Sequence, residues 1–233
     1  MTADPHRAAK EVAVARAVQL IEDGMVLGLG TGTTAELLFP WLGARLAQGW
    51  RLQGVASSVR TEALARGIGL PLVPLTHPGQ LDLTIDGADE VDPQLRLVKG
   101  RGGALLREKV LAQASRRLVI VVDESKLVPQ LGSRALLPVE VVPFGWQVVR
   151  ERLLQLGAQT VTLRREGKAL FHTDNGNLVL DCQFAAIASP EQLDIALHRV
   201  AGVVEHGLFL GLATVVLVGR ADGTVQELWA ERP

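Results

Sequence analysis

Tyrosine is absent from this 233-residue chain, and aromatic residues make up only 4% of it. Side chains on which nucleotide bases could stack are therefore scarce. Basic and acidic residues nearly balance, with a formal net charge of -1, so the chain lacks the positive charge that attracts nucleic acid or an anionic membrane surface. These absences argue against both nucleic acid and membranes as partners.

A single cysteine, Cys182, excludes an internal disulfide and a zinc site built from cysteines. The five histidines are scattered without the helical pairs that bind metals, and we expect each of them at the surface or in a loop. The most apolar run without charge, residues 207–219, is shorter than the ~20 residues that a membrane span needs. The N-terminal segment mixes charged with apolar residues, unlike a secretion signal. We therefore expect a cytoplasmic protein with no metal site and no membrane partner.

Lysine is also scarce. Only five of the 24 basic residues are lysines, namely Lys10, Lys99, Lys109, Lys126 and Lys168. Because the chain uses arginine for ordinary surface charge, a lysine beside a glycine turn or an acidic cluster is more informative than usual.

The order of apolar segments predicts an α/β fold. At 48% hydrophobic residues the chain can bury a full core. A helix over residues 8–21 is followed by strands that alternate with helices, and this alternation predicts a doubly wound, mostly parallel Rossmann-like sheet. The expected strands span residues 25–30, 51–58, 81–86, 95–100 and 117–125. A helix from about Thr34 is expected to kink or end at Pro40.

The pattern changes after Gly132 to β-α-β-β-α-β, which is typical of an inserted ferredoxin-like α+β domain. A further strand near residues 213–220 is expected to return to the first sheet. We therefore predict a catalytic domain of residues 1–132 plus 207–233 and a ferredoxin-like domain of residues 133–206.

A glycine-rich loop joins the first expected strand to a helix in the stretch GLGTGTT, residues 28–34. Backbone N–H groups of such a loop can surround an anion, and the hydroxyls of Thr31, Thr33 and Thr34 can donate further hydrogen bonds. The stretch is neither a P-loop nor the dinucleotide fingerprint. The alternative is a tight turn in which Thr33 or Thr34 caps the helix. Likewise, one serine of Ser57-Ser58 is expected to cap the next helix.

Four carboxylates crowd into the stretch TIDGADEVD, residues 84–92, at the end of an expected strand. Ligands gather beyond the carboxyl ends of parallel strands. Gly87 and Ala88 are small enough to let a ligand approach Asp86 and Asp89. We expect Glu90 and Asp92 to be solvated turn residues. One alternative to a ligand site is a surface turn for the whole cluster. Another is a divalent metal site, although the spacing is not that of an EF-hand and no histidine is present.

The next strand end carries Lys99-Gly100-Arg101-Gly102-Gly103, which suits a negatively charged or developing oxyanion. On the following helix, Glu108 lies among Ala104, Leu111 and Ala112, so it is expected to be partly desolvated and to suit a general base. A solvated Arg-Glu-Lys triplet is the alternative.

Lys126 stands at one more strand end. A base, an oxyanion-stabilising group and a phosphate loop without a cofactor together suggest proton transfer next to the carbonyl of a phosphorylated sugar.

At this point the chain resembles type A ribose-5-phosphate isomerase. The resemblance covers most of the chain, and its stretches occur in the family's order: GLGTGTTA, SSVRTEALARGIGLPL, DLTIDGADEVDPQLRLVKGRGGALLREKVLA, DESKLVPQLG, LPVEVVPFGW and TDNGN. It implies interconversion of D-ribose 5-phosphate and D-ribulose 5-phosphate through an enediol(ate), in the pentose phosphate pathway. It also implies a two-domain fold and a homo-oligomer, a dimer or tetramer, without metal or organic cofactor.

The resemblance also implies roles by position. Glu108 matches the general base that moves the proton between C2 and C1, and Lys99 with the turn Gly100–Gly102 matches the group that stabilises negative charge on the substrate oxygens. Asp86 and Asp89, flanking Gly87 and Ala88, match carboxylates that hold hydroxyls and assist ring opening. The residues that match the family's substrate-binding loop are Thr31, Gly32, Thr33 and Thr34. Lys126 and Lys10 match lysines that face the phosphate end of the substrate. Arg101 departs from the glycine of some members.

Two other functions stay open at this stage. One is a non-catalytic sugar-phosphate sensor, which would need the phosphate loop but not Glu108. The other is a related isomerase or deaminase of amino sugar phosphates. The sequence shows no helix-turn-helix segment or basic stretch that would serve as the output of a sensor.

Overall fold

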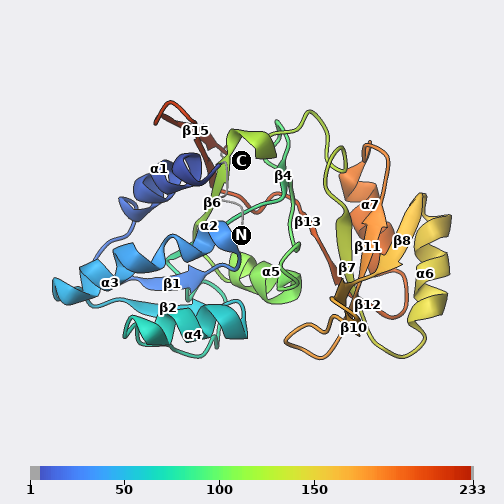
Figure 1. Ribbon diagram of the computed structural model, residues 1–233, viewed down its shortest axis with the longest axis horizontal. Coiled ribbons are helices and arrows are strands. Elements are labelled where there is room, and N and C mark those ends of the chain that lie inside the picture. Colours follow the sequence, from blue (N-terminus) through green and yellow to red (C-terminus); the bar gives the residue numbers. More distant parts are fainter. Residues whose placement is uncertain (1–5, 232–233) are drawn as a thin grey trace. The chain divides into compact units, whose positions relative to one another are not determined.

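The computed structural model describes residues 6–231, which divide into two compact units (Figure 1). The first unit comprises the described parts of Met1–Ala88 and Leu212–Pro233 together with Arg107–Lys126. The second unit comprises Asp89–Leu106 and Leu127–Gly211. The chain therefore passes between the units several times.

The first unit is built on a six-stranded sheet with the strand order β15-β14-β6-β3-β1-β2. All neighbouring strands pair in parallel except β15, which is antiparallel to β14. The strands are β1 (Val26–Leu29), β2 (Gln53–Ala56), β3 (Leu83–Asp86), β6 (Leu118–Asp123), β14 (Val215–Gly219) and β15 (Val225–Trp229).

Helices cover both faces of this sheet. Alternate residues of a strand point to opposite faces, and here both faces carry apolar side chains that pack against helices. On one face, Leu27, Leu29, Leu83 and Ile85 share a core with α1 (Arg7–Val18), α3 (Phe39–Ala47) and α4 (Val59–Gly67). On the other face, Val26 and Val55 pack against Leu81 and against Leu111 of α5 (Leu105–Gln113). The predicted doubly wound, mostly parallel sheet is confirmed.

The helix expected from Thr34 is interrupted before Pro40. The structure has a four-residue helix, α2 (Thr33–Glu36), and α3 then starts with Pro40 in its first turn. Proline is tolerated there because the first N–H groups of a helix have no partner within the helix. The N-cap of α4 is Ser58, as expected, and its Oγ accepts a hydrogen bond from Thr61 N at 3.0 Å.

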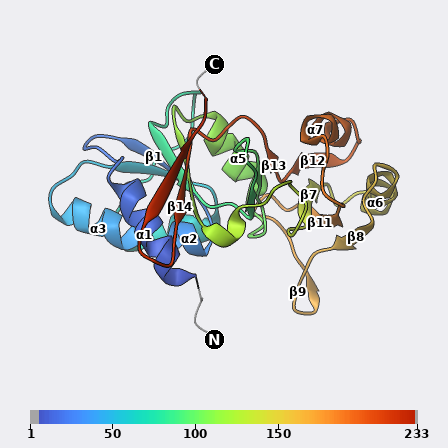
Figure 2. The same cartoon turned by 90° about the horizontal axis from the view of Figure 1, so that it is seen from above.

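The second unit contains the predicted ferredoxin-like arrangement. Its four-stranded antiparallel sheet has the order β12-β7-β11-β8, and a helix follows β7 and another precedes β12. A short hairpin between β8 and β11 was not predicted and projects from the sheet (Figure 2). The elements are β7 (Leu137–Val141), α6 (Trp146–Gln155), β8 (Thr160–Leu163), β9 (Arg165–Glu166), β10 (Ala169–Leu170), β11 (Leu178–Gln183), α7 (Pro190–His198) and β12 (Val203–His206).

A small three-stranded sheet, in the order β13-β5-β4, completes the second unit. It consists of β4 (Glu90–Val91), β5 (Leu97–Val98) and β13 (Leu208–Phe209). The strand expected at residues 95–100 therefore pairs outside the six-stranded sheet. These pairings group residues 89–106, 127–132 and 207–211 with the second unit, whereas the predicted boundaries placed them in the first domain. The reason is that β5 pairs with β13, which directly follows β12.

The described helices were also compared with the dimensions of a bilayer. None of them combines the length and the apolar character that a membrane crossing requires.

Candidate functional site

The glycine-rich loop of the first unit follows β1 and lies against the end of β3. Gly30 N donates to Ile85 O at 3.0 Å. The hydroxyl of Thr31 lies within hydrogen-bonding distance of Ser57 Oγ at 2.7 Å and Ser58 Oγ at 2.9 Å, so it fixes the loop to the start of α4. Gly32, with φ 107°, is the N-cap of α2 and makes no side-chain cap. A threonine cap, the alternative explanation of this loop, is therefore wrong.

Asp86 lies directly beside this loop. Its side chain is 1% exposed, and its Oδ1 accepts a hydrogen bond from Gly87 N at 2.8 Å. A Cβ atom added to Gly30 would lie 2.2 Å from Asp86 Oδ1. Glycine at position 30 is thus what allows the carboxylate to approach the loop. Of the remaining loop residues, Thr33 is exposed, and Gly32 and Thr34 are half-buried. Within the first unit, the structure brings together the predicted phosphate loop and the first predicted carboxylate.

Glu108 lies in the first part of α5 and is buried, with only 4% of its surface exposed. The neighbouring Lys109 is 5% exposed. The alternative of a solvated Arg-Glu-Lys triplet is therefore wrong, and the expected desolvation of Glu108 agrees with its burial. A buried carboxylate without a solvation shell suits proton transfer better than a solvated one.

Two further predicted residues belong to the first unit. Lys126 ends a short 3-10 helix, η1 (Glu124–Lys126), directly after β6, and it is half-buried. Its turn is held by the buried Asp123, which accepts hydrogen bonds from Ser125 N at 3.0 Å and from the Ser125 hydroxyl. Lys10 lies half-buried on α1, which packs against β6 and β14.

The lysine-glycine turn belongs to the second unit and follows β5. Lys99 is 3% exposed, its N donates to Gly207 O at 2.9 Å, and its Nζ lies 5.3 Å from the centre of the Phe209 ring. Gly100 has φ 103°, a conformation that favours glycine. Arg101 N donates to Asp89 Oδ2 at 3.0 Å, so Asp89 holds this turn with one of its oxygens. Residues Arg101 and Gly102 are exposed, whereas Gly87 and Ala88 of the acidic run are half-buried.

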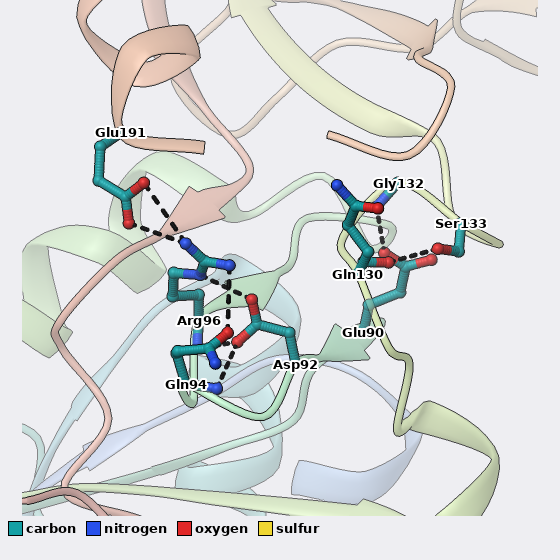
Figure 3. A network of polar contacts seen from close by, with 8 residues as sticks. All are labelled: Glu90, Asp92, Gln94, Arg96, Gln130, Gly132, Ser133 and Glu191. Carbon is teal, nitrogen blue, oxygen red and sulfur yellow. Dashed lines mark hydrogen bonds and ion pairs between the residues drawn. The ribbon is translucent and has the colours of Figure 1, made fainter. Parts of the chain in front are cut away.

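The expectation that Glu90 and Asp92 are solvated is wrong, because they are 1% and 2% exposed. Glu90 accepts hydrogen bonds from three backbone N–H groups of the loop that follows residue 131, at 2.6–2.7 Å. Asp92 accepts hydrogen bonds from Gln94 N, Arg96 N and Arg96 Nε (Figure 3). No local pattern reports the burial of Glu90, since its donors lie more than 40 residues away. The donors to Asp92 lie within four residues of it.

Among the described residues, one group could offer three ligands to a metal, and it was missed at the sequence level. His206 Nε2 lies 3.1 Å from Asp194 Oδ1 and 3.2 Å from His198 Nδ1. His206 is 0% exposed, so its predicted place at the surface or in a loop is wrong. However, Leu208 N donates to His206 Nδ1 at 3.3 Å, which places the proton of the neutral ring on Nε2, facing Asp194. The group is therefore satisfied as a hydrogen-bonded network that joins α7 to β12.

Comparison with known proteins identifies the family. The sequence model described as ribose 5-phosphate isomerase A (phosphoriboisomerase A) matches residues 53–223. The chain belongs to the ribose 5-phosphate isomerase A family. The ribose-5-phosphate isomerase A of Thermomicrobium roseum is 52% identical over 92% of this chain and 91% of its own length.

Solved structures of the family share the fold over nearly the whole chain. Ribose 5-phosphate isomerase from Plasmodium falciparum is 35% identical, with a TM-score of 0.92, covering 97% of this chain and 99% of that one. A D-ribose-5-phosphate isomerase in complex with phospho-erythronic acid is 37% identical, with a TM-score of 0.90, covering 95% and 97% of the two chains. The resemblance inferred from the sequence motifs is thereby confirmed.

Proposed function

We propose that this protein interconverts D-ribose 5-phosphate and D-ribulose 5-phosphate, since its relatives are named ribose-5-phosphate isomerases. The observation that carries the proposal is the burial of Glu108, at 4% exposure, in a chain that belongs to this family. A non-catalytic sensor would have no need to bury a carboxylate at that position.

The proposed reaction is a proton transfer through an enediolate. Glu108 removes the proton from C2 of the open-chain aldose and returns it to C1, while a hydroxyl proton moves from O2 to O1. Lys99 and the Gly100–Gly102 turn stabilise the negative charge that develops on these oxygens. Asp86 and Asp89 accept hydrogen bonds from the sugar hydroxyls, and Gly87 and Ala88 leave room for the sugar.

The phosphate end is assigned to the loop Thr31–Thr34, with Lys126 and Lys10 as the cationic partners. The hydrogen-bonding distances from the Thr31 hydroxyl to Ser57 and Ser58 support a positioning role for that hydroxyl. Thr33 and Thr34 are then the side chains proposed to reach the phosphate. The ligand of the related enzyme, phospho-erythronic acid, also joins a phosphate to a polyhydroxy chain, which supports a sugar phosphate as the class of substrate.

We further propose that the protein acts in the cytoplasm, in the pentose phosphate pathway, as a homo-oligomer. Large apolar side chains exposed on the second unit, among them Phe144 at 92% and Val148 at 67%, support association. Sedimentation equilibrium would test the oligomer by giving a mass that is a multiple of the chain mass.

The deciding experiment measures ribulose 5-phosphate formed from ribose 5-phosphate by the wild type and by Glu108→Gln. Loss of a general base should lower kcat by roughly 10²–10⁴-fold. Glu151→Gln, which changes an exposed glutamate of α6, is the matched control and should leave kcat unchanged. A wild type that binds ribose 5-phosphate without turnover would contradict the proposal and favour a sensor. Turnover that survives in Glu108→Gln would keep the reaction but remove Glu108 as the base.

A further inference from the structure

The carbonyl groups of the lysine-glycine turn point to one side chain of the ferredoxin-like sheet. Arg164 Nη1 donates to Gly100 O and to Arg101 O, both at 3.0 Å. All three residues belong to the second unit. Arg164 directly follows β8, and its own N donates to Val179 O at 2.9 Å, so its backbone is fixed to β11.

The guanidinium group of Arg164 is itself held rigidly. Its Nε donates to Asp181 Oδ2 at 2.9 Å, and its Nη2 donates to Asp181 Oδ1. The two side chains are only 13% and 17% exposed. A planar guanidinium bound to both oxygens of one carboxylate has its remaining N–H groups aimed in a fixed direction. That direction is toward the turn.

The far end of the turn is fixed by an aromatic ring that Arg164 also contacts. The Arg164 guanidinium lies 5.6 Å from the centre of the Phe171 ring, and Phe171 N donates to Arg164 O at 3.1 Å. A Cβ atom added to Gly103 would lie 2.2 Å from Phe171 Cζ. The ring therefore occupies the space that a side chain at residue 103 would need, and the turn is held at both ends.

These contacts determine where the N–H groups of the turn point. In a trans peptide the N–H points opposite to the C=O of the same unit. Because Gly100 O accepts a hydrogen bond from Arg164, the N–H of Arg101 is directed away from the guanidinium. This N–H donates to Asp89 Oδ2 at 3.0 Å. With Arg101 O on Arg164, the N–H of Gly102 is likewise directed away from it.

We propose that Arg164 is a positioning residue for the reaction, which fixes the Lys99–Gly103 turn and thereby the direction of Lys99 and of the Gly102 N–H. The inference rests on the proposed function, in which this turn stabilises the charge on the substrate oxygens. Its role is to position the donors of the turn, without contact to the substrate.

Kinetics of Arg164→Met, Arg164→Lys and Asp181→Asn test this role. Arg164→Met should lower kcat by roughly 10- to 100-fold, because misplacement of a charge-stabilising group by about 1 Å costs that much, and KM should change little. Lysine keeps the positive charge but lacks the several N–H donors of the planar guanidinium, so Arg164→Lys should also have a lower kcat than the wild type. Arg165→Met, which changes the next residue in the exposed hairpin, is the matched control and should keep the wild-type kcat. In a Lys99→Met background, Arg164→Met should cause a smaller loss of kcat than in the wild type, because only the direction of the Gly102 N–H is then left to disturb.

A second measurement does not depend on turnover. Trypsin cleaves after arginine, and Arg101 is exposed in the turn. Release of the turn in folded Arg164→Met or Asp181→Asn should speed cleavage after Arg101 by about 10-fold or more, because proteolysis follows local opening. Arg165→Met should cleave at the wild-type rate. Unchanged cleavage in both variants overturns the inference, as does a wild-type kcat in all three. A wild type that does not turn over ribose 5-phosphate contradicts the proposed function, and the rate of cleavage then decides separately whether Arg164 fixes the turn.

Discussion

At the residue scale, the acidic run of residues 84–92 shows how neighbouring carboxylates acquire different tasks. Glu90 and Asp92 are buried and meet backbone N–H groups and Arg96, so their charge is used to hold loops of the second unit. Asp86 instead lies beside the glycine-rich loop of the first unit. All three are acidic residues within one short run, so the sequence could not tell the structural carboxylates Glu90 and Asp92 from Asp86. For Glu90, contacts to residues more than 40 positions away make the carboxylate structural, whereas Asp92 is held by donors within four residues of it.

Gly30 offers a test of how closely Asp86 must approach the loop. Gly30→Ala should place a methyl group in the space of the Asp86 carboxylate and displace it, so we expect kcat to fall by roughly 100-fold, as for other displaced site groups. Gly43→Ala is the control, since a Cβ there meets Ile68 at an ordinary 3.6 Å within a helix. It should keep kcat and stabilise the fold by about 0.5–1 kcal/mol. Turnover assays and urea unfolding of both variants give the comparison, and an active Gly30→Ala would show that Asp86 can move without loss.

At the scale of elements, the pattern of apolar residues predicted the parallel strands and the ferredoxin-like order correctly, because both depend on local periodicity. It did not predict β15 or the β9–β10 hairpin, whose residues are half-buried or exposed and carry no clear alternation. It also placed residues 95–100 in the main sheet. Pairing of β5 with β13, more than 100 residues later, decides that strand, and no local pattern reports it.

The ion pair between α1 and β15 predicts a pH-dependent contribution to stability. Arg16 Nε lies 2.5 Å from Glu227 Oε1, and this hydrogen bond, assisted by Trp229, holds the pKa of Glu227 below its ordinary 4.5. Because the pKa of Glu227 is lower in the folded than in the unfolded chain, the stabilisation is fully present above pH 4.5. It is lost as the pH falls through the pKa that Glu227 has in the folded protein. Glu227→Gln should therefore cost about 0.5 kcal/mol at neutral pH, because the pair is partly exposed.

Urea unfolding of Glu227→Gln beside wild type, at neutral pH and in steps below pH 4.5, measures this contribution. The difference should close on the acid side. The exposed Glu166→Gln of the β9–β10 hairpin should show no comparable difference at either pH. A gap that persists or widens in acid would assign the effect of position 227 to packing rather than to charge.

At the scale of the whole molecule, the division into units was predicted only in outline. The two cores are separate clusters, as the change of pattern after Gly132 indicated. The boundaries differ because the segment 89–106 crosses into the second unit and forms β4 and β5 there. Asp86 and Glu108 therefore belong to the first unit, and Asp89 and Lys99 belong to the second. A purely local reading of the sequence assigns them all to one domain.

The distribution of charge over the chain predicts that the reaction needs no metal ion. An enediolate requires positive charge or hydrogen-bond donors near its oxygens, which enzymes supply with a metal or with protein groups. Here three of only five lysines, Lys10, Lys99 and Lys126, stand among the proposed site residues. The side chain of His206 is within hydrogen-bonding distance of those of Asp194 and His198, and the three residues lie on α7 and β12. Protein dialysed against EDTA should therefore keep its full kcat, with metal content followed by mass spectrometry. A loss of kcat that added Mg²⁺ or Zn²⁺ restores would mean that a metal supplies the charge here assigned to Lys99.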